Sequence, residues 1–237
     1  MPAPVVHIEN LRFRWRRGDA PCLDIAGFTI DGGERVFLHG ASGSGKSTLL
    51  ALIGGVLTPE AGHVKVLDAD LTKMSGPQRD RFRADHIGFI FQQFNLVPYL
   101  TVIDNVLLAC RFSRRRRERA LAGGATLHDE AVRLLDHLDI DAPLRARPVV
   151  QLSVGQQQRV AAARALIGWP ELVIADEPTS SLDADRQAAF LDLLVRECGE
   201  AGVTLVFVSH DMRLAANFTR VIGLASFNRP AAEREAA

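Results

Sequence analysis

The chain has 237 residues, of which 47% are hydrophobic and 24% charged, a composition typical of a soluble globular protein and unlike that of a disordered or fibrous chain. Lysine plus arginine and aspartate plus glutamate each number 28, so the formal net charge is zero. A neutral chain lacks the long-range attraction to a polyanion that nucleic-acid-binding domains show. We therefore expect no nucleic-acid partner.

The cysteines and the hydropathy indicate where the protein works. Cys22, Cys110 and Cys198 are odd in number and far apart, so they predict neither a disulfide framework nor a metal site. The N-terminus lacks the basic start and long apolar stretch of a secretory signal, and no apolar run reaches the roughly 18 residues that cross a bilayer. We expect a cytoplasmic protein that other chains hold at the inner membrane if it acts there.

The N-terminal part of the sequence predicts several strands and one helix. Loosely alternating apolar residues, interrupted at Arg17-Gly18 and Gly32-Gly33, predict three strands. The segment "KSTLLALI" then has apolar residues at helical spacing until a glycine pair ends it. Two further apolar segments predict strands that follow this helix. The predicted strands are residues 5–13, 22–30, 34–40, 62–71 and 86–91.

Helical patterns dominate residues 95–165, where apolar residues recur at helical spacing without intervening strands. Strand patterns return at residues 171–178 and 202–210, with a helical pattern over 183–202 between them. Two strands joined by a helix form a βαβ unit, so we expect these strands to be parallel. The tail, residues 229–237, is short, polar and rich in alanine, and we expect it to be disordered.

The segment "GASGSGKS", residues 40–47, fits the pattern G-x-x-x-x-G-K-[ST] between a predicted strand and a predicted helix. Its glycines let successive backbone N–H groups converge on phosphate oxygens at the positive end of the helix dipole. Lys46 adds a cation for the β- and γ-phosphates, and the Ser47 hydroxyl can bind Mg²⁺. The alternative is a glycine-rich turn that only joins strand to helix. The predicted nucleoside triphosphate site comprises Gly40, Ala41, Ser42, Gly43, Ser44, Gly45, Lys46, Ser47 and Thr48.

The segment "LVIADE", residues 172–177, places two acids at the carboxyl end of a predicted buried strand, where ligands of α/β sheets bind. Asp176 is the candidate Mg²⁺ ligand, and Glu177 is the candidate base for the attacking water. A strand that simply ends in a capping acid would have the same pattern. The phosphate loop earlier in the chain favours the metal interpretation.

The segment "LSVGQQQRVAAARAL", residues 152–166, places Ser153 where it can cap a long helix. It resembles the L-S-G-G-Q signature of ABC transporter ATPases. The resemblance implies that two chains meet head to tail around two ATP molecules, and that Ser153, Gly155 and Gln156 complete the site on the second copy. Val154 stands where the family usually has a glycine, and a β-branched residue there would be strained in a left-handed turn.

The same resemblance covers nearly the whole chain and implies roles for four more residues. Trp15 corresponds to the aromatic residue that stacks on adenine, although an ordinary core or edge aromatic would have the same pattern. Gln92 corresponds to the glutamine that senses Mg²⁺ and the γ-phosphate, with the adjacent Gln93 as the less favoured alternative. Asp183, in "SSLD", residues 180–183, corresponds to the acid at the dimer interface, and His210 to the histidine that contacts the γ-phosphate.

The resemblance also implies the fold. We expect an α/β protein with a P-loop NTPase core and a mostly parallel sheet, an N-terminal antiparallel β subdomain and an inserted α-helical subdomain. Residues 1–237 would form a single domain, with the core and β subdomain at 1–94 and 166–228 and the helical subdomain at 95–165. A chain of this length is expected to have no additional regulatory domain.

The implied activity is hydrolysis of ATP with Mg²⁺, coupled to integral-membrane permease subunits. The segments "GFIFQQFNLVPYLTVIDNV" and "TLLALIGGVLTPEAGHV" are similar to ATPases of lipoprotein-release and macrolide-efflux type systems, which favours export or mechanotransmission. An importer ATPase is an alternative, as is a soluble ABC ATPase, although the long coiled-coil insertion, second cassette or basic surface of that class is missing. A P-loop kinase or GTPase would leave "LSVGQQQ" unexplained.

The arginines within residues 114–119 are expected to form a solvated face, with anionic lipid or a partner as the alternative.

Overall fold

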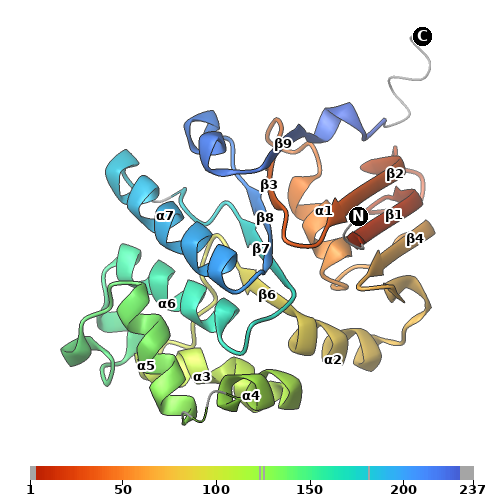
Figure 1. Cartoon of the computed structure of the whole chain (residues 1–237). Helices are drawn as coiled ribbons and strands as arrows, with labels where there is room; N and C mark the ends of the chain where they lie inside the picture. Colours follow the sequence, from red (N-terminus) through yellow and green to blue (C-terminus); the bar gives the residue numbers. More distant parts are fainter. Residues whose placement is uncertain (1–3, 123, 125, 181, 230–237) are drawn as a thin grey trace.

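A parallel sheet forms the centre of the molecule (Figure 1). The computed structural model describes residues 4–229 except 123, 125 and 181, so the predicted tail lies, beyond its first residue, outside the described residues. All neighbouring strands of this sheet are parallel, as the βαβ pattern predicted for its second and third strands. The strand order is β6 (Ile87–Ile90), β7 (Leu172–Asp176), β8 (Thr204–Val208), β3 (Arg35–His39) and β9 (Arg220–Gly223).

An antiparallel sheet from the N-terminal part of the chain lies beside the parallel one. Its strands are, in spatial order, β2 (Leu23–Asp31), β1 (Pro4–Phe13), β4 (Ala61–Val66) and β5 (Ala69–Asp70). The expectation of one continuous strand over residues 62–71 is wrong, because Leu67 and Asp68 have positive φ angles of 51° and 64° and turn the chain into a hairpin. The two sheets confirm the α/β class with an N-terminal antiparallel unit.

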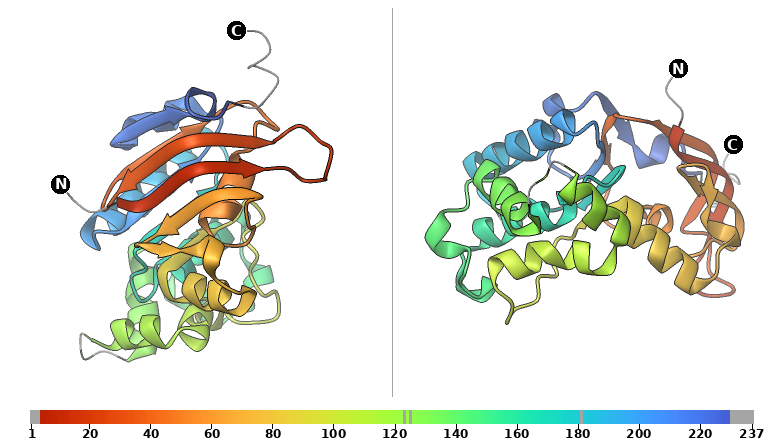
Figure 2. Two further views of the ribbon diagram at one scale, coloured as in Figure 1. Left: turned by 90° about the vertical axis from the view of Figure 1, so that its right-hand side faces the viewer. Right: turned by 60° about the horizontal axis from the view of Figure 1, so that its bottom comes forward.

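The described helices gather mainly at the side of the molecule away from the antiparallel sheet (Figures 1 and 2). None of them has the length and the apolar character needed to cross a membrane. The helices are α1 (Lys46–Ile53), α2 (Gly76–His86), α3 (Val102–Phe112), α4 (Arg114–Leu121), α5 (Leu127–His137), α6 (Val154–Leu166) and α7 (Ala184–Glu200).

Two hydrophobic cores cover the two faces of the parallel sheet. Because side chains alternate along a strand, Val36 and Leu38 of β3 enter one core while Phe37 enters the other. The first core contains the apolar residues of α1 and of the antiparallel sheet. The second contains those of α3, α5, α6 and α7. Helices α1 and α6 therefore lie against opposite faces of the same sheet.

The sequence patterns did not predict α2 or β9. Helix α2 starts at a capping box, in which the backbone N–H of Ser75 donates to the side-chain oxygen of Gln78. All residues of this helix are at least partly exposed. An exposed helix carries no apolar stripe, so the periodicity that marks the other helices is missing. Strand β9 is a short edge strand that pairs with β3.

The arginine-rich segment 114–119 is partly built into the fold, which corrects the expectation of a solvated face. Arg116 is only 3% exposed and donates hydrogen bonds to the carbonyls of Ala165 and Ile167, at the C-terminal end of α6. Burial lowers the pKa of Arg116 to about 10. Arg115 and Arg119 form ion pairs with Glu171. Much of this segment therefore anchors α4 to α6 and to the loop before β7.

Candidate functional site

Four segments with predicted site residues follow neighbouring strands of the parallel sheet. The phosphate loop follows β3, His210 follows β8, Asp176 ends β7 and Gln92 follows β6. Since the carboxyl ends of parallel strands share one edge of a sheet, these segments come together at that edge. The backbone confirms the convergence: Glu177 N donates to Val208 O at 3.0 Å, and Ser209 N donates to Leu38 O at 3.4 Å.

The backbone of the phosphate loop requires glycine at two positions. Gly43 and Gly45 have φ angles of 75° and 105°, in the region that side chains rarely adopt. A methyl group at Gly45 would also lie 2.9 Å from Leu23 Cδ2 and 3.2 Å from Cys22 Sγ, at the start of β2. The loop is therefore curled tightly against the antiparallel sheet, and α1 begins at the next residue, Lys46.

Lys46 is buried beneath the loop and points into its centre. Its Nζ donates to the carbonyls of Gly40 and Ala41, each at 2.9 Å. The Ser44 hydroxyl is buried and has no hydrogen-bond partner among the described residues. A loop with a central ammonium, an unpaired hydroxyl and a helix N-terminus is suited to anionic oxygens. The neighbouring Thr48 is buried as well, whereas Ala41, Ser42 and Ser47 are exposed.

Asp176 lies beside Ser47 at the end of β7. Burial raises the pKa of its carboxyl group, and the charge of Glu177 acts in the same direction, while a hydrogen bond with Ser47 opposes them. Its Oδ1 is buried and lacks a hydrogen-bond partner within the described part of the chain. A buried carboxylate oxygen with no partner, next to a hydroxyl, fits the oxygen ligands that Mg²⁺ prefers.

Glu177 and His210 form a pair at the same edge. His210 Nδ1 lies 3.6 Å from Glu177 Oε2, and the His210 side chain is 68% exposed. Glu177 has a φ angle of 44°, which is uncommon for a residue with a side chain and requires support from its surroundings. That support includes its backbone bond to the end of β8. The carboxylate is thereby held at the strand ends and remains accessible from solvent.

Gln92 and Trp15 lie at the border of this site. Gln92 is exposed, two residues beyond the end of β6. Trp15 is 63% exposed and packs edge-on against Phe13, with ring centroids 5.2 Å apart. Phe13 pairs with Leu23, the residue that contacts Gly45, so the turn that carries Trp15 adjoins the phosphate loop. An exposed aromatic ring in that position leaves a face available for stacking.

The signature segment forms the N-terminus of α6. Ser153 caps the helix: its hydroxyl accepts from Gln156 N at 3.4 Å, and Gln156 Oε1 accepts from Ser153 N at 2.9 Å. Val154 is the first helical residue and does not have a positive φ, so the left-handed turn that would strain it does not occur. Gly155 has open space around it, with Leu182 Cδ2 3.8 Å from the position of a methyl group.

Asp183 caps α7 next to the signature segment. Its Oδ1 accepts from Arg186 N at 3.0 Å, and its other oxygen pairs with the Arg186 guanidinium at 3.2 Å. Ser181, within the "SSLD" segment, lies outside the described residues. Capping and this ion pair account for the present contacts of Asp183.

The predicted residues thus fall into two groups that the structure keeps apart. One group surrounds the phosphate loop and the strand ends, with α1 on one face of the sheet. The other surrounds the N-terminus of α6, which packs on the opposite face. Among the described residues, no hydrogen bond or ion pair joins Ser153, Gly155 or Gln156 to the phosphate loop.

The sequence patterns missed one residue, which connects helix α6 to the loop after Gln92. Arg164, near the end of α6, donates Nη1 to Asn95 O and Nη2 to Phe94 O, both at 2.7 Å. These carbonyls follow Gln92 closely in the chain. The signal available in the sequence was an arginine between two alanines, Ala163 and Ala165, on the apolar side of a predicted helix. Such a position requires polar partners from elsewhere in the fold.

Most of the chain is similar to known ATP-binding cassettes. It is 40% identical to the lipoprotein-releasing system ATP-binding protein LolD of Syntrophotalea carbinolica, over 83% of each chain, and 40% identical to the phosphonates import ATP-binding protein PhnC of Rhodopseudomonas palustris, over 92% of this chain and 80% of that one. It is 37% identical to the macrolide export ATP-binding/permease protein MacB of Rhodopirellula baltica over 92% of this chain, but spans only 31% of that relative's length.

The fold agrees with these similarities. The dimeric structure of a post-hydrolysis state of the ATP-binding cassette MJ0796, bound to ADP and Pi, superposes with a TM-score of 0.81 at 35% identity, covering 92% of this chain and 93% of that one. The ABC transporter family model matches residues 23–180, which run from β2 past the phosphate loop, the signature segment and β7. The chain therefore belongs to the ABC transporter family and is an ATP-binding ATPase cassette of that family.

Proposed function

We propose that two copies of this chain bind head to tail and enclose two ATP molecules, each between the phosphate loop of one copy and the N-terminus of α6 of the other. The observation that carries the proposal is the placement of α1 and α6 against opposite faces of one sheet. A two-fold interface brings such distant surfaces together reciprocally. The similar cassette MJ0796, described as dimeric, supports this arrangement.

In this arrangement each copy supplies part of the reaction centre. Ser153, Gly155 and Gln156 present a helix N-terminus to the γ-phosphate held by the other copy. The open space at Gly155 lets a phosphate approach the backbone closely. Leu182, the residue before Asp183, lies next to Gly155. Asp183 therefore lies at the interface between the copies.

The reaction is transfer of the γ-phosphoryl group to water. Glu177 accepts the proton of the attacking water, and His210 and Gln92 contact the γ-phosphate and orient that water. Lys46 leaves the carbonyls of Gly40 and Ala41 to bind the β- and γ-phosphates. Ser47, Asp176 and Gln92 would hold Mg²⁺, which neutralises charge on the phosphates when bound. Trp15 stacks on the adenine ring.

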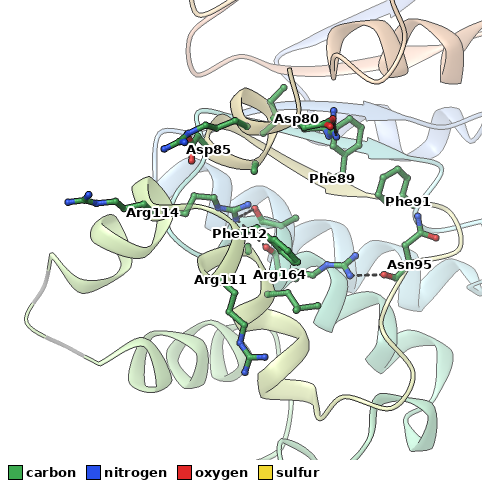
Figure 3. A pocket seen from close by; sticks show the side chains of 17 residues that line it. Asp80, Asp85, Phe89, Phe91, Asn95, Arg111, Phe112, Arg114 and Arg164 are labelled. Atoms are coloured by element: carbon green, nitrogen blue, oxygen red, sulfur yellow. Dashed lines mark hydrogen bonds and ion pairs between the residues drawn. The ribbon is translucent and has the colours of Figure 1, made fainter. Parts of the chain in front are cut away.

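We further propose that integral-membrane permease subunits dock in the cleft beside the Gln92 loop (Figure 3). This cavity of about 810 Å³ lies between the core and the helices of residues 95–165, which we treat as the helical subdomain, with residues 1–94 and 166–228 as the nucleotide-binding core. Phe91 and Asn95, on either side of Gln92, line it. A segment bound there would contact the loop that contacts ATP.

The side chains of the cleft define the kind of segment it accepts. Phe112 is 78% exposed in it, and Phe89 and Phe91 stack at a centroid distance of 5.1 Å. The charged side chains are mostly basic, so the occupant is a cytoplasmic segment of the permease with apolar and acidic residues. The charged lining residues are Asp80, Asp85, Arg81, Arg83, Arg111, Arg114, Arg116 and Arg164.

Docking of this kind would make the protein a peripheral subunit on the cytoplasmic side of the inner membrane. The similarity to LolD and MacB favours export or mechanotransmission through the permease. The equal identity to PhnC, an import ATP-binding protein, keeps import as a second candidate. Purification from native membranes, followed by identification of the co-purifying integral-membrane chain, distinguishes these directions.

Complementation between two inactive variants tests the shared reaction centre. Lys46→Ala disables the phosphate loop, and Gly155→Asp places a negative charge where the γ-phosphate of the other copy would bind. Each variant alone should hydrolyse ATP very slowly. A one-to-one mixture forms some mixed dimers in which one site has both intact halves, so its rate should clearly exceed the mean of the two variants. A mixture no faster than that mean would refute the shared site.

A further inference from the structure

The loop after Gln92 has a backbone that needs external support. Phe94 and Asn95 are consecutive residues with positive φ angles, 59° and 48°, although neither is glycine. A left-handed conformation is unfavourable for a residue with a side chain, for phenylalanine more than for asparagine. Local hydrogen bonds contribute to its support, from Phe94 N to Phe91 O at 2.9 Å and from Asn95 N to Gln93 O at 2.6 Å.

Arg164 supplies the remaining support from a distant part of the chain. The tight turn directs the carbonyls of Phe94 and Asn95 toward α6, where one guanidinium binds both. Figure 3 shows the bond between Arg164 and Asn95. Hydrogen bonds from a charged donor are roughly twice as strong as neutral ones. Among the described residues, no ion pair joins Arg164 to a carboxylate. The two carbonyls therefore compensate for the partial burial of its guanidinium.

Helix α6 connects this contact to the signature segment. Arg164 lies eleven residues beyond the cap Ser153, a separation of roughly 16 Å along a helix. The end of the helix is fixed by Arg116, whose guanidinium binds the carbonyls of Arg164, Ala165 and Ile167. The C-terminal end of α6 therefore contacts the Gln92 loop and α4, and its N-terminal end carries the signature segment.

We propose that Arg164 is a positioning residue, which holds the strained Gln92 loop on α6 so that Gln92 and the signature cap Ser153 move as one body. This inference rests on the proposed role of Gln92 in hydrolysis. Arg164 does not touch the nucleotide; it acts through the backbone of Phe94 and Asn95. Its loss should therefore affect the rate of the chemical step more than the binding of ATP, because the contacts that hold Lys46 in the phosphate loop do not involve Arg164.

The test compares Arg164→Met, Arg164→Lys and the matched control Arg159→Met in the full chain. Arg159 lies on the same helix and donates to backbone carbonyls, of Leu138 and Asp139, at 3.5 and 3.3 Å, but these belong to a loop far from Gln92 in the sequence. Two quantities are measured for each variant: kcat and KM for ATP, and hydrogen exchange of peptides that cover residues 91–97.

For Arg164→Met we expect faster exchange in residues 91–97 and a kcat about ten- to a hundredfold lower, with KM within about twofold of the parent. Arg164→Lys keeps the charge and can bind one carbonyl, so its exchange rate and its kcat should lie between those of Arg164→Met and the parent. Arg159→Met should match the parent in both measurements. If Arg164→Met fails to fold, the same measurements on Arg164→Lys test the inference.

Two results would overturn the inference: exchange at the parent rate in residues 91–97, or a change confined to KM. The proposed function is tested separately by Glu177→Gln. A normal rate in Arg164→Met beside an inactive Glu177→Gln would refute only the role of Arg164. A normal rate in Glu177→Gln would refute the proposed reaction centre, and the exchange measurement would still report whether Arg164 holds the loop.

Discussion

Glu177 and His210 face each other across the ends of β7 and β8, with Oε2 of the carboxylate 3.6 Å from Nδ1 of the imidazole. The carboxylate comes from a buried strand and the imidazole from the exposed end of its neighbour. In the proposed reaction His210 contacts the γ-phosphate, and a proton acceptor held beside it can activate a water molecule between them.

Replacement of Glu177 by glutamine should lower kcat by at least about a hundredfold, because an amide cannot accept the proton of the attacking water. Binding of ATP should persist, so the variant should accumulate as a dimer when ATP is present. Steady-state hydrolysis and size-exclusion chromatography measure the two effects. The control is Glu118→Gln, an exposed carboxylate on α4 that pairs with Arg114. Hydrolysis at the parent rate would exclude Glu177 as the base.

Replacement of Lys46 by alanine should weaken ATP binding by at least about tenfold, since a charge-assisted contact to the phosphates is lost. The chain contains three lysines, and Lys65, which is partly exposed on β4 and pairs with Glu9, provides a matched control. Isothermal titration of each variant with ATP measures the affinity. The phosphate-loop assignment requires Lys65→Ala to bind like the parent, and equal affinities for all three proteins would contradict it.

Glu171 should make the fold sensitive to acid. Burial alone would raise the pKa of its carboxyl group, but hydrogen bonds from His86 and Arg115 and the charge of Arg119 lower it from 4.5 to about 2. A carboxyl group with a lowered pKa stabilises the folded state above its ordinary pKa and loses this contribution as the pH falls through the folded value. We expect a contribution of about 1–2 kcal/mol at pH 7 that declines between pH 4.5 and 2.

Urea unfolding of the parent and of Glu171→Gln at several pH values measures this contribution. The difference in unfolding free energy between the two proteins should be largest at neutral pH and should shrink toward pH 2. A difference that stays constant over this range would show that Glu171 does not titrate as described.

Gln158 should be replaceable by methionine with a gain in stability. Its side chain is fully buried in α6, and both polar atoms lack hydrogen-bond partners in the described structure. An unpaired buried polar group costs about 1–3 kcal/mol, whereas methionine fills a similar volume without that cost. We expect the melting temperature to rise by about 2–4 °C.

The neighbouring Gln157 is the matched control for this prediction. Its Nε2 donates to Leu152 O at 3.0 Å, so Gln157→Met loses a hydrogen bond and should not gain stability. Differential scanning calorimetry measures both variants. A lower melting temperature for Gln158→Met than for the parent would mean that the Gln158 amide has partners in solution.

Local patterns in the sequence were sufficient for several parts of this molecule. The phosphate loop depends on glycines and one lysine within a single short segment, residues 40–47, and the buried strands depend on apolar runs. The hairpin at Leu67 and Asp68 was not predicted, because neither residue is a glycine and the pattern continues through the turn. Helix α2 was missed since it has no buried stripe for periodicity to reveal.

Contacts between distant segments were beyond the reach of such patterns. Arg164 and Phe94 are separated by 70 residues, and nothing local shows that a carbonyl will turn toward a guanidinium on another helix. The partners of Arg116 are likewise set by how α4 packs on α6. The convergence of Asp176, His210 and the phosphate loop followed from the parallel strand order, which the βαβ pattern predicted only for β7 and β8.

The position of α1 and α6 on opposite sides of the parallel sheet has a kinetic consequence. If one polypeptide offers only half of each reaction centre, specific activity depends on protein concentration, and the turnover of a dilute sample is second order in the polypeptide. Fusing two copies through a flexible tether would make it first order. A partner that held two copies side by side would have the same effect as this fusion.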